Sequence, residues 1–148
     1  MSTTATGATA AQRASAVTVA PDVPDVVEIV LPPDSAYLSV LRTATAGLAA
    51  RLDFTLDDIE DLRIAVDEAC AMLLPHALSG ATLRCRFELR GDRLDVTVTL
   101  PSRATALPAR DTFAWTVLSA LAGEVDAGID GEAMAWISLH KRKGPVPA

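Results

Sequence analysis

The most conspicuous chemical feature of this sequence is a cluster of carboxylates on one short stretch of chain. Six acidic residues form it: Asp57, Asp58, Glu60, Asp61, Asp67 and Glu68. Carboxylates can act as general acids and bases in catalysis. Acidic residues also gather at the start of a helix, where they offset the positive end of the helix dipole. This simpler explanation accounts for Asp57, Asp58 and Glu60.

The histidines and cysteines form no second cluster. His76 and His140 stand alone, and an isolated histidine is more often structural than catalytic. Cys70 and Cys85 lie in apolar patterns without metal-ligand spacing, so we interpret them as reduced, buried thiols; a disulfide between them is the less favoured alternative. The sequence has no P-loop-type glycine run and no zinc-ligand spacing. We therefore predict no metal site.

The composition indicates one folded domain with a hydrophobic core. The chain has 148 residues, of which 50% are hydrophobic and 22% charged, and a chain of this length buries roughly 70% of its unfolded surface. A net charge of −6 argues against a surface that binds the phosphates of nucleic acid. There is no signal-peptide pattern and no apolar run of about 18 residues. We expect a cytoplasmic protein that neither spans a membrane nor binds nucleic acid directly.

The ends of the chain differ from its middle. Residues 1–24 are rich in Ala, Thr, Ser and Pro, which predicts a disordered leader, and residues 144–148 form a tail. Residues 25–143 are the expected single domain. Within it, residues 26–31 have the composition of a strand that ends at two prolines.

Two helices are predicted next. The first is capped by Asp34 or Ser35, and its apolar stripe is Leu38, Leu41, Leu48 and Leu52. The second begins with a capping box formed by Thr55 and Asp58. Its apolar residues recur every three or four positions: Leu56, Ile59, Leu62, Val66, Ala69 and Leu73.

The second half of the domain changes to an alternating pattern. Residues 83–90 and 94–100 alternate between apolar and polar around a turn at residues 91–92, which predicts a β-hairpin with one buried face. A proline-containing loop, a helix over 113–122 and a last strand over 133–140 follow. The predicted fold is α+β, a two-layer sandwich with about three helices on one face of a mainly antiparallel sheet.

The run from Asp58 to Cys70, which contains the letters DLRIAVDEAC, closely resembles the nucleotide-binding helix of the RsbW/SpoIIAB anti-sigma factors. These are small serine kinases with the GHKL (Bergerat) ATPase fold. Residues 37–42 and 118–125 resemble the same family, and the similarity extends over about residues 26–142. The run FAWTVLSALAGEV makes the actinobacterial anti-sigma subgroup the nearest match.

The resemblance implies roles for three residues on and after this helix. Glu68 matches the glutamate that orients or deprotonates the attacking serine hydroxyl in the kinases. The position of the magnesium-binding asparagine is Met72, and His76 lies one turn further, where relatives also carry a histidine. Magnesium prefers hard oxygen ligands, and a thioether is a soft one. Glu68, Met72 and His76 are therefore expected to line a degenerate cofactor site.

Two further nucleotide-binding elements of the family are absent. Relatives follow the hairpin with Asp-x-Gly-x-Gly, whereas this chain has Leu100 to Ala104, without an acid or a glycine. A second glycine box should precede the third helix, where Thr112 and Ala114 stand beside bulky Phe113 and Trp115. We expect no cofactor, because ATP and magnesium are implied by the family resemblance only.

The resemblance implies a regulator of transcription. We expect an anti-sigma factor that sequesters a sigma factor by direct binding and is released by an anti-anti-sigma protein of the STAS type. Arg42 is the expected partner-binding residue, because in relatives a matching arginine contacts both partners. Relatives also pair through sheet edges and the first helix, which implies a homodimer. The alternatives are an active serine kinase acting on the anti-anti-sigma factor, and a degenerate scaffold domain with other partners.

Overall fold

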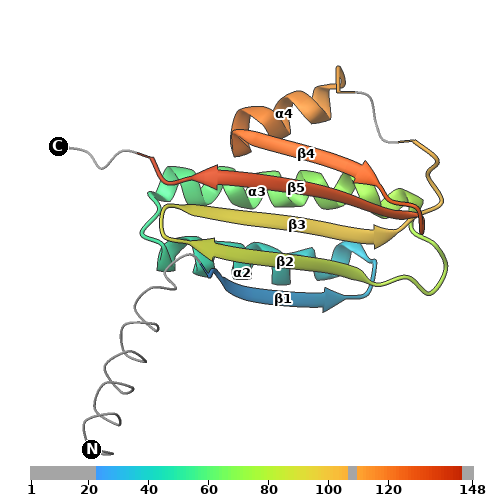
Figure 1. Ribbon diagram of the computed structural model, residues 1–148, viewed down its shortest axis with the longest axis horizontal. Helices are drawn as coiled ribbons and strands as arrows, with labels where there is room; N and C mark the ends of the chain where they lie inside the picture. Colours follow the sequence, from blue (N-terminus) through green and yellow to red (C-terminus); the bar gives the residue numbers. More distant parts are fainter. Residues whose placement is uncertain (1–22, 107–109, 145–148) are drawn as a thin grey trace, which may run out of the picture.

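Five antiparallel strands and three α-helices build the part of the chain that the structure describes (Figure 1). The computed structural model describes residues 23–106 and 110–144. The sheet order is β1-β2-β3-β5-β4, with strands β1 (Asp25–Leu31), β2 (Leu83–Arg90), β3 (Arg93–Pro101), β4 (Glu124–Ile129) and β5 (Met134–Arg142). The helices are α2 (Leu38–Arg51), α3 (Leu56–Leu73) and α4 (Phe113–Ala122), and short 3-10 turns are η1 (Ser35–Tyr37) and η2 (Leu74–His76). The predicted α+β class is confirmed.

The core lies between the helices and one face of the sheet. The alternation predicted for β2 is observed, since Leu83, Cys85 and Phe87 are buried and the residues between them are exposed or half-exposed. α3 contacts both α2 and α4, and its buried residues form one face of the helix. This face packs on the apolar side of the sheet, so the opposite side of the sheet is left open to solvent (Figure 1).

Side-chain caps define where the helices begin. Asp34 accepts a hydrogen bond from the backbone N–H of Ala36 at 2.9 Å, so it caps the short turn η1 that leads into α2. The Thr55 hydroxyl accepts a bond from the Asp58 N–H at 3.2 Å, which is the predicted cap of α3. These bonds satisfy backbone donors that have no partner within a helix.

Strand β4 was not predicted from the sequence. Its six residues include Asp126 and Gly128, which are rare in strands, so local propensity gives no strand signal there. The structure explains the glycine. Gly128 lies opposite Trp136 of β5, and a Cβ at Gly128 would stand 2.6 Å from Cζ2 of the indole. The edge strand therefore forms through its pairing with β5 and through the fit of the indole over the glycine.

The expected leader and tail fall almost entirely outside the described residues, as does Pro108 of the predicted loop. Within the described ranges, no helix has the length and apolar character needed to cross a membrane.

Candidate functional site

The central helix α3 carries the predicted site residues on two different sides. Glu68 and Met72 are one helical turn apart and share a flank of the helix. Asp67 lies about 100° around the helix axis from Glu68, and its side chain contacts α2. The structure therefore separates a candidate nucleotide flank from a candidate partner-binding flank.

The candidate nucleotide flank runs from α3 into η2. Glu68 is half-buried, and no described residue forms a hydrogen bond or ion pair with its carboxylate. Met72 is partly buried and packs against the hydrophobic core. His76 is exposed at the end of η2. Glu68 is thus available for acid–base chemistry, but the thioether at position 72 belongs to the core and supplies no hard ligand for magnesium.

The segment after β3, where relatives recognise adenine, is bonded to its neighbours on both sides. The Arg103 N–H donates to the His76 carbonyl at 2.7 Å, and its guanidinium donates to the Pro75 carbonyl at 3.0 Å. The Ser102 N–H donates to the carbonyl of Ala133 in the β4–β5 turn at 2.9 Å. These bonds tie the segment to η2 and to the β4–β5 turn, and the segment carries no acid that could bind an adenine amino group.

Two aromatic residues, Phe113 and Trp115, lie at the start of α4. The Thr112 hydroxyl caps the helix by accepting a bond from the Trp115 N–H at 3.3 Å. Trp115 is buried, with the Arg110 guanidinium 4.6 Å from its ring centroid, while Phe113 is 84% exposed. Arg110 also donates to Asp126 of β4 at 2.9 Å. Bulky rings therefore stand where a glycine box would let the backbone approach phosphates.

Three positions differ from the nucleotide site that the family resemblance implies. Met72, at the magnesium position, is a thioether that packs against the core, the segment after β3 has no acid, and Phe113 and Trp115 stand at the second glycine box. Four of the cavities within the described residues have volumes of about 230 to 480 Å³, and none of these four is lined by Glu68, Met72 or His76.

The candidate partner-binding flank is built by Arg42 of α2 and Asp67 of α3. Nη1 of Arg42 donates to both carboxylate oxygens of Asp67, each at 3.1 Å. The side chains are 38% and 33% exposed. The sequence predicts that the Arg42 guanidinium reaches solvent, and it does so while it is held by an acid of the neighbouring helix. Sequence reasoning did not identify Asp67 as that acid, because the pair depends on how the two helices pack.

Several curated proteins are similar to this chain. The serine-protein kinase RsbW of Halalkalibacterium halodurans is 42% identical over 74 residues, which cover 49% of this chain and 46% of that protein. The anti-sigma-F factor RsbW of Mycobacterium tuberculosis is 37% identical over 94 residues, which cover 64% of this chain and 56% of that protein. The serine-protein kinase RsbW of Bacillus subtilis is 38% identical over 75 residues, which cover 49% of this chain and 47% of that protein.

The resemblance to RsbW proteins is confirmed. The chain spans about half the length of the curated relatives it matches. No family model matches it. The names of the RsbW relatives describe two activities, serine-protein kinase and anti-sigma factor, so similarity to them does not choose between the two.

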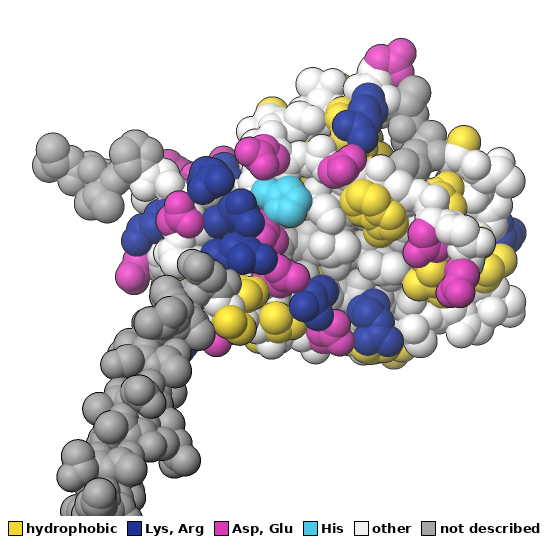
Figure 2. Space-filling model, in the orientation of Figure 1, with side chains coloured by type: hydrophobic (Ala, Val, Ile, Leu, Met, Phe, Trp, Pro, Cys, Tyr) yellow, Lys and Arg dark blue, Asp and Glu magenta, His cyan; other side chains and the backbone are white. Residues whose placement is uncertain are grey.

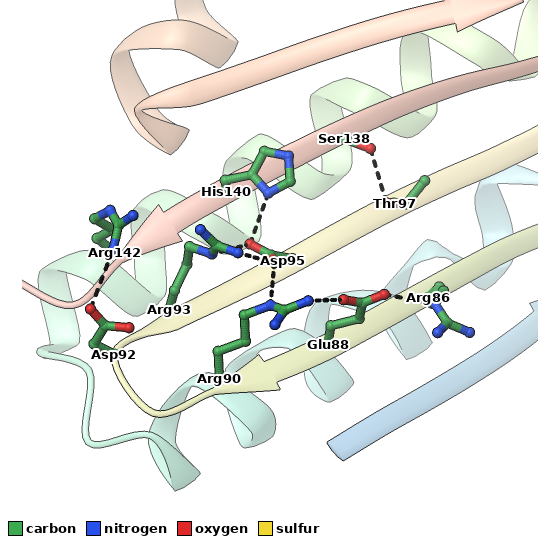
Figure 3. Close-up of polar contacts among 10 residues, drawn as sticks. All are labelled: Arg86, Glu88, Arg90, Asp92, Arg93, Asp95, Thr97, Ser138, His140 and Arg142. Carbon is green, nitrogen blue, oxygen red and sulfur yellow. Dashed lines mark hydrogen bonds and ion pairs between the residues drawn. The ribbon is translucent and has the colours of Figure 1, made fainter. Parts of the chain in front are cut away.

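The open face of the sheet carries a polar network that the sequence did not reveal (Figure 3). Asp95 of β3 accepts bonds from Arg90 and Arg93, each at 3.0 Å, and lies 2.8 Å from Nδ1 of His140 on β5. Figure 2 shows acidic and basic side chains gathered around a histidine on this face. The alternation of residues 83–100 places Asp95 on the polar face, but the arginines that cover it leave it only 6% exposed. His140 is therefore a structural histidine in this network.

The two cysteines are free and buried, as predicted. Burial first, and then the Asp67 carboxylate, raises the pKa of Cys70 to about 12. Burial and the neighbouring Cys70 raise the pKa of Cys85 well above its usual range. Because the thiolate is the reactive form, neither side chain is a nucleophile near neutral pH.

Proposed function

We propose that this chain is an anti-sigma factor that sequesters a sigma factor by direct contact in the cytoplasm and is released by an anti-anti-sigma partner. Under this proposal it acts by occlusion, without a functional ATP site. The Mycobacterium tuberculosis relative is named as an anti-sigma factor. The net charge of −6 suits a protein that covers a basic partner.

One observation favours occlusion over catalysis. Met72, at the position of the magnesium-binding asparagine, is a thioether that packs against the hydrophobic core. Phosphoryl transfer depends almost entirely on positioning of the phosphates and magnesium. A chain with Met72 at this position and no acid directly after β3 lacks the parts that such positioning needs.

A second candidate function is an active serine kinase that phosphorylates the anti-anti-sigma protein. The relatives from Halalkalibacterium halodurans and Bacillus subtilis carry that name. Glu68, which matches the catalytic glutamate of the family, is half-buried with no described partner for its carboxylate. This arrangement would leave Glu68 free to accept a proton from a serine hydroxyl.

The experiment that tests the proposal begins with capture of sigma factors from the organism's own cells on the tagged full chain. The captured sigma factor is then purified and used in a transcription assay with core RNA polymerase. We expect stoichiometric inhibition that does not depend on added ATP and magnesium. Failure to bind any sigma factor would overturn the proposal, and transfer of the γ-phosphate to a serine of the anti-anti-sigma protein would establish the kinase instead.

A further inference from the structure

The contact between Arg42 and Asp67 leaves one edge of the arginine fork free. Only Nη1 is bonded to Asp67, at 3.1 Å to each oxygen. Nε and Nη2 form no hydrogen bond with a described residue. These two atoms make up the side of a guanidinium that binds a carboxylate with two parallel hydrogen bonds. Asp67 therefore holds the guanidinium of Arg42 through Nη1 and does not bond the edge formed by Nε and Nη2.

The backbone beneath Arg42 is fixed by the core. Leu38 and Leu41 are buried, and Leu41 is completely inaccessible to solvent. The Thr45 hydroxyl, also fully buried, donates to the Leu41 carbonyl at 2.6 Å. The base of the side chain is held by these contacts and its tip is held by Asp67. Such a side chain loses less conformational freedom when a partner binds than a freely rotating arginine does.

We propose that Asp67 is a positioning residue for partner binding. It orients Arg42 so that Nε and Nη2 receive a carboxylate of the sigma factor. This inference rests on the proposed function and assigns a role to a residue that the family resemblance does not mark. Asp67 and the partner carboxylate repel each other, but both are partly exposed, so water and salt screen that repulsion.

The test measures, by calorimetry, the affinity of the captured and purified sigma factor for variants of the full chain. Asp67→Ala removes both acceptors and should weaken binding by roughly five- to tenfold, the cost of ordering a free arginine side chain. Asp67→Asn keeps one acceptor oxygen and should weaken binding less.

A double-mutant cycle separates positioning from a general structural effect. In the Arg42→Ala background, Asp67→Ala should have no further effect on affinity, because the group that it orients is gone. The melting temperature of each variant should stay near that of the unmodified chain, because the pair is half-exposed. Glu60→Ala is the matched control. Glu60 is an acid on the same helix whose partner is Arg63 at 2.8 Å, and its loss should leave affinity unchanged.

The outcomes are distinguishable. If the unmodified chain does not bind a sigma factor, the proposed function fails and this inference fails with it. If the unmodified chain binds but Asp67→Ala binds equally well, only the positioning role is overturned. Tighter binding by Asp67→Asn would also overturn it, because Asp67 would then be a competitor of the partner carboxylate.

Discussion

Nδ1 of His140 lies 2.8 Å from Oδ1 of Asp95, and the contact joins β5 to β3 on the open face of the sheet (Figure 3). Burial alone would raise the pKa of Asp95. The hydrogen bond with His140 and those from Arg93 and Arg90 outweigh burial, so the pKa of this carboxyl lies below its ordinary value. The network therefore stabilises the fold in a way that depends on the ionised carboxylate.

We expect Asp95→Asn to lower the free energy of unfolding near pH 7 by about 1–3 kcal/mol, because it removes the charge shared by two arginines. A carboxyl whose folded-state pKa is depressed contributes stability above its unfolded pKa of about 3.9 and loses that contribution as pH falls through the lower folded value. The difference between the variant and the unmodified chain should thus shrink below about pH 4. Urea unfolding at several pH values measures it.

A matched control for Asp95 is Asp92, which bonds Arg142 at 3.2 Å in an exposed pair. Asp92→Asn should change stability by less than about 1 kcal/mol, as is usual for surface ion pairs. A constant difference between Asp95→Asn and the unmodified chain from pH 7 to pH 3 would contradict the assigned role of the carboxylate.

Two glycines should respond in opposite ways to replacement by alanine. Gly128→Ala places a methyl group 2.6 Å from the Trp136 ring and should destabilise the fold by about 1–3 kcal/mol. Gly47 lies inside α2, where a Cβ would meet no atom within 4 Å, so Gly47→Ala should stabilise the fold by about 0.5–1 kcal/mol. Thermal unfolding followed by circular dichroism tests both. Equal effects would show that the indole does not lie over Gly128.

The sequence predicted those elements whose signal is local. At the start of α3, the Thr55 half of the predicted capping box is present, with the Asp58 N–H donating to the Thr55 hydroxyl. The predicted apolar face is buried except at its first two residues, since Leu56 is 84% exposed and Ile59 is partly buried. The β2–β3 hairpin follows directly from alternation around a turn. β4 escaped prediction because its residues have weak strand propensity, and its pairing with β5 becomes visible only in three dimensions.

The candidate site also combines residues that the sequence identified with contacts that depend on how distant segments pack. Glu68, Met72 and His76 were predicted from a family resemblance that the sequence itself carries, and the structure places the first two on α3 and His76 in η2. The contacts of Arg103 with the carbonyls of His76 and Pro75 join segments that no local pattern relates.

Titration with ATP and magnesium should leave the melting temperature unchanged. A ligand that binds only the folded state stabilises it by about 2.7 kcal/mol at a hundredfold excess over its Kd, which a thermal-shift assay detects easily. Because position 72 is a thioether and no acid directly follows β3, we expect millimolar ATP to give a flat response. Glu68→Gln should likewise leave sigma binding nearly unchanged. A saturable rise in melting temperature would favour the kinase.

The exposed edge of the sheet leads to the last prediction, a homodimer. β1 pairs only with β2 among the described strands, so its other side presents unpaired backbone groups. Three valines of this strand, Val26, Val27 and Val30, are 42%, 37% and 48% exposed. Edge strands of monomers are commonly protected by charges or prolines. β1 carries Asp25 and Glu28, but its valines remain exposed, and a second copy would cover them.

Sedimentation at micromolar concentration should therefore show a species of twice 15.5 kDa. Val27→Lys places a charge on the apolar edge and should shift the equilibrium toward the monomer, because burying an unpaired charge in an interface is costly. Glu28→Lys is a control for added charge on the same strand, although it also disrupts the contacts of Glu28 with Arg84 and Arg86. Arg51→Lys, which keeps the charge of an exposed residue outside β1, should leave the dimer intact. A species near 15.5 kDa alone in the unmodified chain would reject the dimer and leave the β1 edge open to solvent.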